Sequence, residues 1–279
     1  MSPGKIGMGL RLPIALTILI LAAAPARGAP ASELWERWVA HDPASSVSVD
    51  HGFWDRFLAA YVVAEGGVNR VAYARVTPGD RGALEDYIGS LAATPADGLR
   101  RAEQLPFWIN LYNALTVKVV LDHYPVESIK DIDISPGLFA DGPWGKKLVT
   151  VEGEALSLDD IEHRILRPIW KDPRLHYVLN CAALGCPNLQ PRAFTAGNAQ
   201  ALLSRGARQY VNDPRGVAFD GDRLIVSSLY DWYAADFGGT DTAIISHLER
   251  YARPVLLAKL EAAEDIDDDY YDWTLNDAP

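Results

Sequence analysis

The sequence lacks the short motifs that identify the common cofactor- and nucleotide-dependent enzymes. It contains no G-x-G-x-x-G, no phosphate-loop lysine motif, no H-E-x-x-H and no G-x-S-x-G. These absences argue against dinucleotide-binding, phosphate-loop, zincin and α/β-hydrolase proteins, and we expect no cofactor. The absence of a motif says nothing about glycoside hydrolysis, because paired carboxylates follow no spacing rule.

Positive charge is also scarce. The 26 Lys and Arg residues are outnumbered by 37 Asp and Glu residues, which gives a formal charge of -11, and the basic residues form no cluster. Nucleic acids and anionic lipids need a basic surface for counterion release, so we expect neither as a partner. The remaining composition, 49% hydrophobic and 23% charged, is ordinary for a globular protein.

No hydrophobic run is long enough to make a transmembrane helix the first interpretation. The uncharged run Leu12–Ala24 follows Lys5 and Arg11 and is about 13 residues long, short of the roughly 20 that span a bilayer. Small residues follow at Ala26-Arg27-Gly28. This pattern predicts a signal peptide over residues 1–28 and a periplasmic or secreted mature protein that is not stably inserted in a membrane. A retained anchor is the alternative.

Cysteine is rare, and its two occurrences lie close together. Cys181 and Cys186 bracket a tight loop, and Pro187 pushes Cys186 toward an extended backbone. The β-forming run His176–Asn180 precedes them and predicts a short buried strand that delivers Cys181 to the mouth of the loop. Three chemistries fit the loop: a nucleophilic thiol, a disulfide or part of a metal site.

The remaining pattern predicts one helix-rich α+β domain over residues 29–279. Its centre is Leu105–Tyr124, apolar on nearly every face and therefore a buried helix with Pro106 in its first turn. Hairpins are expected at 148–156 and 217–226, and together with the His176 strand they would form a small sheet. An acidic tail begins at about residue 262, and its Trp273 and Leu275 suggest that it docks on the domain.

Other amphipathic segments predict further helices. These segments are Ser32–Val39, Phe53–Tyr61, Leu84–Leu91, Leu158–Leu166, Leu202–Val211, Ser227–Phe237 and Ala243–Leu260. Gly66-Gly67 is expected to end the second of them, and Pro168 the fourth. Ile129–Lys147, rich in Asp, Gly and Pro, is a long loop of the kind that is often functional.

Polar residues on two of these helices are candidates for a site. Asn110 and Asn113 share a face of the central helix, where they either hold the backbone of neighbouring segments or face the cysteine loop. Glu162 and His163 are neighbours on the helix Leu158–Leu166, about 100° apart, so we do not expect them to point the same way. The histidines at 41, 51, 123 and 247 have no evident partners.

Four motifs resemble those of the domain of unknown function 547 family, which occurs in many exported bacterial proteins and at the C-terminus of some plant proteins. They are F-W-I-N-L-Y-N-A at Phe107–Ala114, S-L-D-D-I-E-H at Ser157–His163, R-L-H-Y-V-L-N-C-A-A-L-G-C-P at Arg174–Pro187 and D-W-Y-A-A-D-F at Asp231–Phe237. The resemblance implies a shared fold and an exported setting, but no agreed reaction.

Three functions remain open at this stage. The first is an extracytoplasmic binding or interaction module in which Cys181 and Cys186 form a disulfide, as export favours. The second is a hydrolase or acyl transferase with Cys181 as nucleophile, His163 or His176 as base, and Asn110, Asn113 or Glu162 as the orienting group. The third is a zinc protein that uses Cys181, Cys186, His163 and His176 as ligands.

The mature protein is expected to start at or near Ala29. Removal of residues 1–28 takes away three basic residues and no acidic one, which shifts the formal charge from -11 to -14. Mass spectrometry of the exported protein should give the mass of the processed chain. Recovery of an intact N-terminus in the membrane fraction would contradict cleavage.

Overall fold

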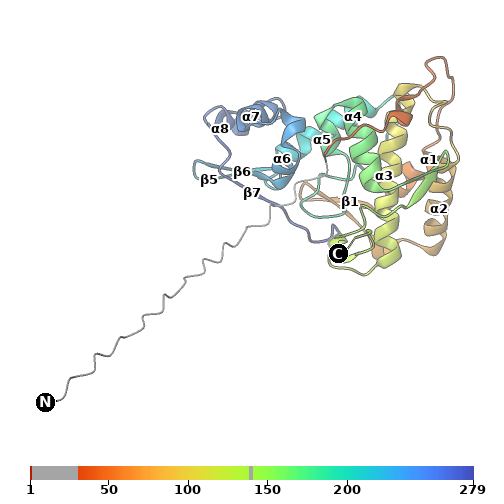
Figure 1. Ribbon diagram of the computed structural model, residues 1–279, viewed down its shortest axis with the longest axis horizontal. Coiled ribbons are helices and arrows are strands. Elements are labelled where there is room, and N and C mark those ends of the chain that lie inside the picture. The colour runs from red at the N-terminus through yellow and green to blue at the C-terminus, as the bar shows by residue number, and fades with distance from the viewer. Residues whose placement is uncertain (2–30, 138–140) are drawn as a thin grey trace.

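The computed structural model describes residue 1 and residues 31–137 and 141–279. The predicted signal peptide lies almost entirely outside these described residues. Within them, no helix is both long and apolar enough to cross a membrane. The architecture is helix-rich α+β with small sheets, as the sequence pattern predicts (Figure 1).

Eight α-helices and seven strands make up the regular elements of the described chain. The helices are α1 (Gly52–Tyr61), α2 (Pro78–Ala92), α3 (Arg101–His123), α4 (Arg167–Trp170), α5 (Ala199–Val211), α6 (Ser228–Trp232), α7 (Asp241–Glu249) and α8 (Pro254–Leu260). The strands are β1 (Val62–Glu65), β2 (Val68–Val71), β3 (Val149–Val151), β4 (Glu154–Leu156), β5 (Val217–Asp220), β6 (Arg223–Ser227) and β7 (Asp268–Tyr270).

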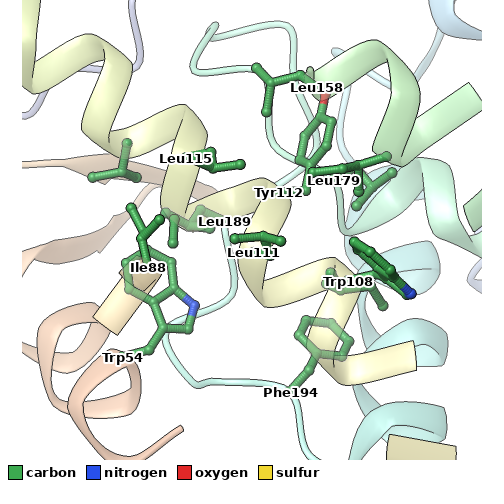
Figure 2. Close-up of a cluster of buried hydrophobic side chains, with 14 of the residues drawn as sticks. Trp54, Ile88, Trp108, Leu111, Tyr112, Leu115, Leu158, Leu179, Leu189 and Phe194 are labelled. Carbon is green, nitrogen blue, oxygen red and sulfur yellow. The ribbon is translucent and has the colours of Figure 1, made fainter. Parts of the chain in front are cut away.

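Helix α3 is the buried centre that the sequence predicts. Figure 2 shows α3 with Trp54 and Ile88, from α1 and α2, on one side and Leu158 and Leu179 on the other. The helix begins at Arg101, earlier than expected, so Pro106 lies inside it rather than in the first turn. Because nearly every face of α3 is apolar, the chain must cover it all round.

The strands form three separate sheets rather than one. Strands β1 and β2 pair with each other, β3 pairs with β4, and β5, β6 and β7 form a three-stranded sheet. The two predicted hairpins are present, and the third was missed because Gly66 and Gly67 were assigned to a helix end. Both glycines have positive φ, which a tight two-residue hairpin turn requires.

The predicted strand at His176–Asn180 is wrong. Pro173–Tyr177 is a 3₁₀-helix, and the Asp172 side chain caps it by accepting a hydrogen bond from the Arg174 backbone N–H. The apolar residues of this run are buried. Their burial comes from packing between helices, and a short buried run does not distinguish that environment from a sheet.

Two prolines affect the predicted helices differently from expectation. The predicted helix Ala243–Leu260 is two helices, α7 and α8, because Pro254 starts a new helix and holds Arg253 extended. Pro168, by contrast, does not stop the helix before it. It falls in the first turn of α4, which continues from the π-helix Asp160–Leu166.

The acidic tail docks on the domain, as Trp273 and Leu275 suggest. Strand β7 pairs in parallel with β6 and so adds a third strand to the β5–β6 hairpin. Further on, the Leu275 backbone N–H donates to the Glu127 carbonyl at 2.7 Å, and the Leu275 side chain is buried. The tail is therefore packed against the rest of the domain.

Buried apolar side chains form two clusters. The larger surrounds α3 and draws on α1, α2, the π-helix and the start of α5. The smaller lies between α5, the β5–β6 hairpin and α6 to α8. Figure 1 shows α7, α8 and strands β5 to β7 at one end of the molecule and α1 to α3 at the other. The segment around Tyr177 joins the two clusters.

The two asparagines of α3 hold backbone, which is one of the two expected roles. Asn110 donates to the Phe194 carbonyl and accepts from the Phe194 N–H, at 2.8 and 3.0 Å. Asn113 bonds to the Val178 carbonyl and the Asn180 N–H, both at 2.9 Å. Asn113 therefore fixes the residues that lead into Cys181, whereas Asn110 fixes a segment beyond the cysteine loop.

Replacing Asn113 by Leu should loosen the cysteine loop. The change leaves a buried carbonyl and a buried N–H without partners, at about 1–3 kcal/mol each. Amide hydrogen exchange should accelerate at residues 180–182. Asn110→Leu is the matched control, because it breaks the same two types of bond on the same helix, and it should instead affect residue 194. Equal acceleration at 180–182 in both variants would contradict this role.

Candidate functional site

A cavity of about 560 Å³ lies where the two apolar clusters meet. Its aromatic lining is Tyr112, Trp144, Trp232, Tyr233, Tyr271 and Trp273. Its ionisable lining is Lys130, Asp141, Asp159, Glu162, His163 and His176, and both cysteines also line it. Segments far apart in sequence thus converge on one space, which is the default location for a binding or catalytic site.

The π-helix Asp160–Leu166 and the residue before it supply three of the ionisable groups. Ser157 caps the start: the Asp160 N–H donates to its hydroxyl at 3.2 Å, and the Ser157 N–H donates back to the Asp160 carboxylate at 2.8 Å. Contrary to expectation, Glu162 and His163 both line the cavity. A π-helix has a wider turn than an α-helix and often occurs at functional sites.

Glu162 is a buried carboxylate held by tyrosine hydroxyls. Burial raises the pKa of Tyr112 well above its ordinary value, and the charge of Glu162 and a hydrogen bond to it raise that pKa further. The pKa of Tyr233 is raised for the same reasons, burial first. Both phenols therefore stay protonated and can donate to the Glu162 side chain, which lines the cavity.

His176 lies between two carboxylates. Its Nε2 donates to Asp236 at 2.7 Å, and its Nδ1 lies 3.7 Å from the Glu162 carboxylate. The Tyr233 ring stacks on the imidazole with centroids 4.1 Å apart. Burial opposes ionisation of Asp236, but hydrogen bonds from His176 and Arg167 prevail and lower its pKa far below the ordinary value. His176 is thus oriented by its neighbours.

His163 is held by a different pair of groups. Arg167 donates to its Nδ1 at 3.0 Å, and its Nε2 lies 3.6 Å from Asp159. Because an arginine only donates, Nδ1 of His163 must be the acceptor and the neutral ring carries its proton on Nε2. Arg167 also donates to Asp236 at 2.6 Å and so links the two histidines.

Cys181 and Cys186 lie at disulfide distance, with their Sγ atoms 2.28 Å apart. Cys181 is partly exposed in the cavity, and its Sγ lies 3.0 Å from the Tyr271 hydroxyl. The loop between them contains Ala182, whose φ of 60° is in the left-handed region that non-glycine residues rarely adopt. Asn180 supports this conformation by accepting from the Ala182 N–H at 3.0 Å.

Five of the six predicted catalytic candidates lie in or beside the cavity. Glu162, His163, His176 and Cys181 line it, and Asn113 braces the backbone just before Cys181. Asn110 is the exception, since it bonds to Phe194. The histidines' own hydrogen bonds go to Asp236 and Arg167, while the cysteine's goes to Tyr271.

The alternative metal ligands share the cavity. Both cysteines and both histidines line it. Among the described residues, however, no group of three or more His, Cys, Asp and Glu side chains is arranged to hold a metal ion.

Two of the histidines without evident partners in the sequence, His51 and His247, are buried, and burial lowers the pKa of each to about 4.

Sequence reasoning missed four residues that contact the candidate histidines or Cys181: Arg167, Tyr233, Asp236 and Tyr271. Two of them, Tyr233 and Asp236, lie in the motif D-W-Y-A-A-D-F, which was available as a signal. Arg167 and Tyr271 carry no such signal. Arg167 lies between the end of a predicted helix and a proline, and Tyr271 lies in an acidic tail.

Replacing Asp236 by Asn should destabilise the protein by about 2 kcal/mol at pH 7, within the range for hydrogen bonds to charged groups. The folded-state pKa of Asp236 is lowered from 3.8, so its contribution is present above about pH 4 and is lost as the pH falls. Urea unfolding should therefore show the difference shrinking from pH 7 to pH 3. The exposed Asp231→Asn is the matched control, and an equal loss there would contradict the assignment.

Comparison with known proteins gives a family match over part of the chain but no function. Residues 96–211 match the model of the family described as "Protein of unknown function, DUF547", and three of the four motifs lie inside this range. Neither the curated proteins nor the solved structures contain a match to the chain. The resemblance to the domain of unknown function 547 family is therefore confirmed over these residues.

Proposed function

We propose that the protein is an extracytoplasmic binding module that holds a small organic ligand in the aromatic cavity beside the Cys181–Cys186 loop. The observation that carries the proposal is the lining of the cavity. Six aromatic side chains from segments spread between residues 112 and 273 surround a space of about 560 Å³. That volume is within the range of small-molecule sites, which are typically apolar with a few placed polar groups.

The aromatic walls favour a ligand with a flat face. Trp232, Tyr271 and Trp273 contact one another, with ring centroids 4.7 to 5.5 Å apart. Trp144 packs edge-on against Trp273 at 5.7 Å. Mutual packing of this kind holds the rings in place before a ligand arrives, so little conformational entropy is lost on binding.

The charges favour a cationic group on that ligand. Glu162 and Asp159 line the cavity, whereas Lys130 is already engaged by Asp141 at 3.3 Å and lies over the Trp273 ring. Arg167 is engaged by Asp236 and His163. Carboxylates beside aromatic faces are the surroundings in which amines and quaternary ammonium groups bind well.

Two geometric facts favour binding over a cysteine-nucleophile hydrolase. The cysteines lie at disulfide distance, and a disulfide sulfur is not a thiolate nucleophile. In addition, Nδ1 of His163 accepts a hydrogen bond from Arg167, and Nε2 of His176 donates one to Asp236. Neither of these two nitrogens is therefore available to take a proton from Cys181. The hydrolase keeps one supporting observation: His176, which bonds to Asp236, lines the same cavity as Cys181. It requires that thiol in its reduced form.

The test is a fragment screen by ligand-observed NMR on the oxidised mature protein. The probes are three matched sets: aromatic amines, neutral aromatic compounds and neutral saccharides. We expect the amines to bind, and Trp232→Ala to weaken them about tenfold, because stacking on a ring contributes about 0.5–1.5 kcal/mol.

Trp170→Ala is the matched control, since Trp170 stacks with Arg101 outside the cavity lining. It should leave amine binding unchanged. Preferential binding of saccharides would overturn the cationic class while keeping the cavity as the site. Binding that is insensitive to Trp232→Ala in all three sets would overturn the cavity itself.

A further inference from the structure

We propose that the Cys181–Cys186 pair is a redox-active disulfide that exchanges with low-molecular-weight thiols entering the cavity. Exposed disulfides are the labile, regulatory or catalytic ones. Here both cysteines line the cavity, but their exposure differs: Cys181 is partly exposed and Cys186 is only 2% exposed. An incoming thiolate therefore meets the Sγ of Cys181 first, because access decides which sulfur is attacked.

The surroundings of Cys186 suit a leaving group. Its Sγ accepts a hydrogen bond from the Cys181 backbone N–H at 2.7 Å. A fixed donor stabilises the thiolate that forms when the sulfur–sulfur bond breaks, and a thiol whose thiolate is stabilised leaves faster. The two sulfurs are thus assigned different roles, Cys181 as the attacked atom and Cys186 as the departing one.

Tyr271 places a hydroxyl on the attacked sulfur. Its oxygen lies 3.0 Å from the Sγ of Cys181, and burial keeps its pKa well above the ordinary value, so the group remains a donor at neutral pH. Whenever Cys181 is released as a thiolate, this hydroxyl is in place to stabilise it. The docked tail therefore supplies a functional group as well as a wall.

Contacts other than the sulfur–sulfur bond fix the shape of the loop. Arg215 donates to the carbonyls of Leu184 and Cys186, at 3.0 and 2.8 Å, and Tyr210 donates to the Gly185 carbonyl at 2.6 Å. Gly185 also packs so closely that an added Cβ would lie 2.8 Å from the Asp272 backbone N. These contacts persist when the disulfide is reduced, so the two thiols stay adjacent and ready to re-form the bond.

The exchange proceeds in two steps, in which atoms and electrons balance. A thiolate attacks Sγ of Cys181, the bond between the cysteines breaks, and its electron pair goes to Cys186. This gives a mixed disulfide on Cys181 and a thiolate on Cys186. A second thiolate attacks the external sulfur of the mixed disulfide and releases Cys181 as a thiolate. Two thiols become one disulfide, the protein pair is reduced by two electrons, and the two protons of the incoming thiols go to the cysteines or solvent.

The test uses glutathione as the probe. Cys186→Ser leaves Cys181 as the single thiol, and Cys181→Ser leaves Cys186. Intact-protein mass spectrometry after alkylation should show that oxidised glutathione modifies Cys181 at least about tenfold faster than Cys186, in keeping with their access. The two variants lack the same cross-link, so a general loosening of the fold affects both, and circular dichroism checks that both are folded.

Wild-type protein provides a readout that needs no variant. Cys181 and Cys186 share one tryptic peptide, so the site must be located by fragmentation of that peptide. After reaction with reduced glutathione and acid quenching, tandem mass spectrometry should place the mixed disulfide on Cys181. Equal modification rates in the two single-thiol variants would overturn the proposal. So would a wild-type disulfide that glutathione reduces only after denaturant is added.

A second pair of variants isolates the hydroxyl. In the Cys186→Ser background, Tyr271→Phe should slow modification of Cys181 severalfold, because the ring stays and only the donor is removed. Tyr270→Phe is the matched control, since Tyr270 is 63% exposed and precedes Tyr271 in the same tail. An unchanged rate in Tyr271→Phe would overturn the role of the hydroxyl. The fragment screen is run on oxidised protein with Cys181 and Cys186 intact, so its result is read independently of these modification rates.

Discussion

The central helix α3 must be covered on every face, and the rest of the fold depends on that requirement. An apolar surface in contact with water is unfavourable by about 25 cal/mol per Å². Helices α1 and α2 cover one side, and the π-helix and the segment around Leu179 cover the other (Figure 2). The amide of Asn113 then attaches the cysteine segment to this helix. The packing that covers α3 therefore also positions the site.

The site lies where the two apolar clusters meet, and this location explains its mixed character. Each cluster contributes aromatic rings, and the junction leaves a space that polar groups can line without losing all contact with water. Buried charges are tolerated there because each has a partner: Asp236 has His176 and Arg167, and Glu162 has two tyrosine hydroxyls. Tight pairing of this kind holds the histidines in fixed orientations.

The acidic tail links the binding proposal to the redox proposal. Strand β7 adds to the sheet of the smaller cluster, and the residues after it reach back to the larger one. Between these two attachments lie Tyr271 and Trp273, both of which line the cavity. A ligand in the cavity would contact the same tail that touches the sulfur of Cys181, so occupancy and access to the disulfide are physically coupled.

Local pattern alone determined the elements whose signal is local. The sequence was sufficient to predict the apolar run of α3, the family motifs and the hairpins that turn between Val151 and Glu154 and between Asp220 and Arg223. Periodicity and turn chemistry act over only a few residues. Boundaries set by a single proline, such as Pro254, were less well read. The helical state of Pro173–Tyr177 was misread, since a short buried run has no period that separates helix from strand.

Only the tertiary structure decided which distant residues meet. Nothing in the spacing of residues 162, 176 and 271 indicates that they share one cavity, or that His176 bonds to Asp236, because these contacts depend on how α3 is covered and where the tail docks. The orientation of Glu162 and His163 likewise followed from a π-helix rather than from sequence distance. Sequence supplied the chemical groups, and packing around the buried helix gave them their partners, since side-chain contacts across a fold are set by the burial of the whole chain.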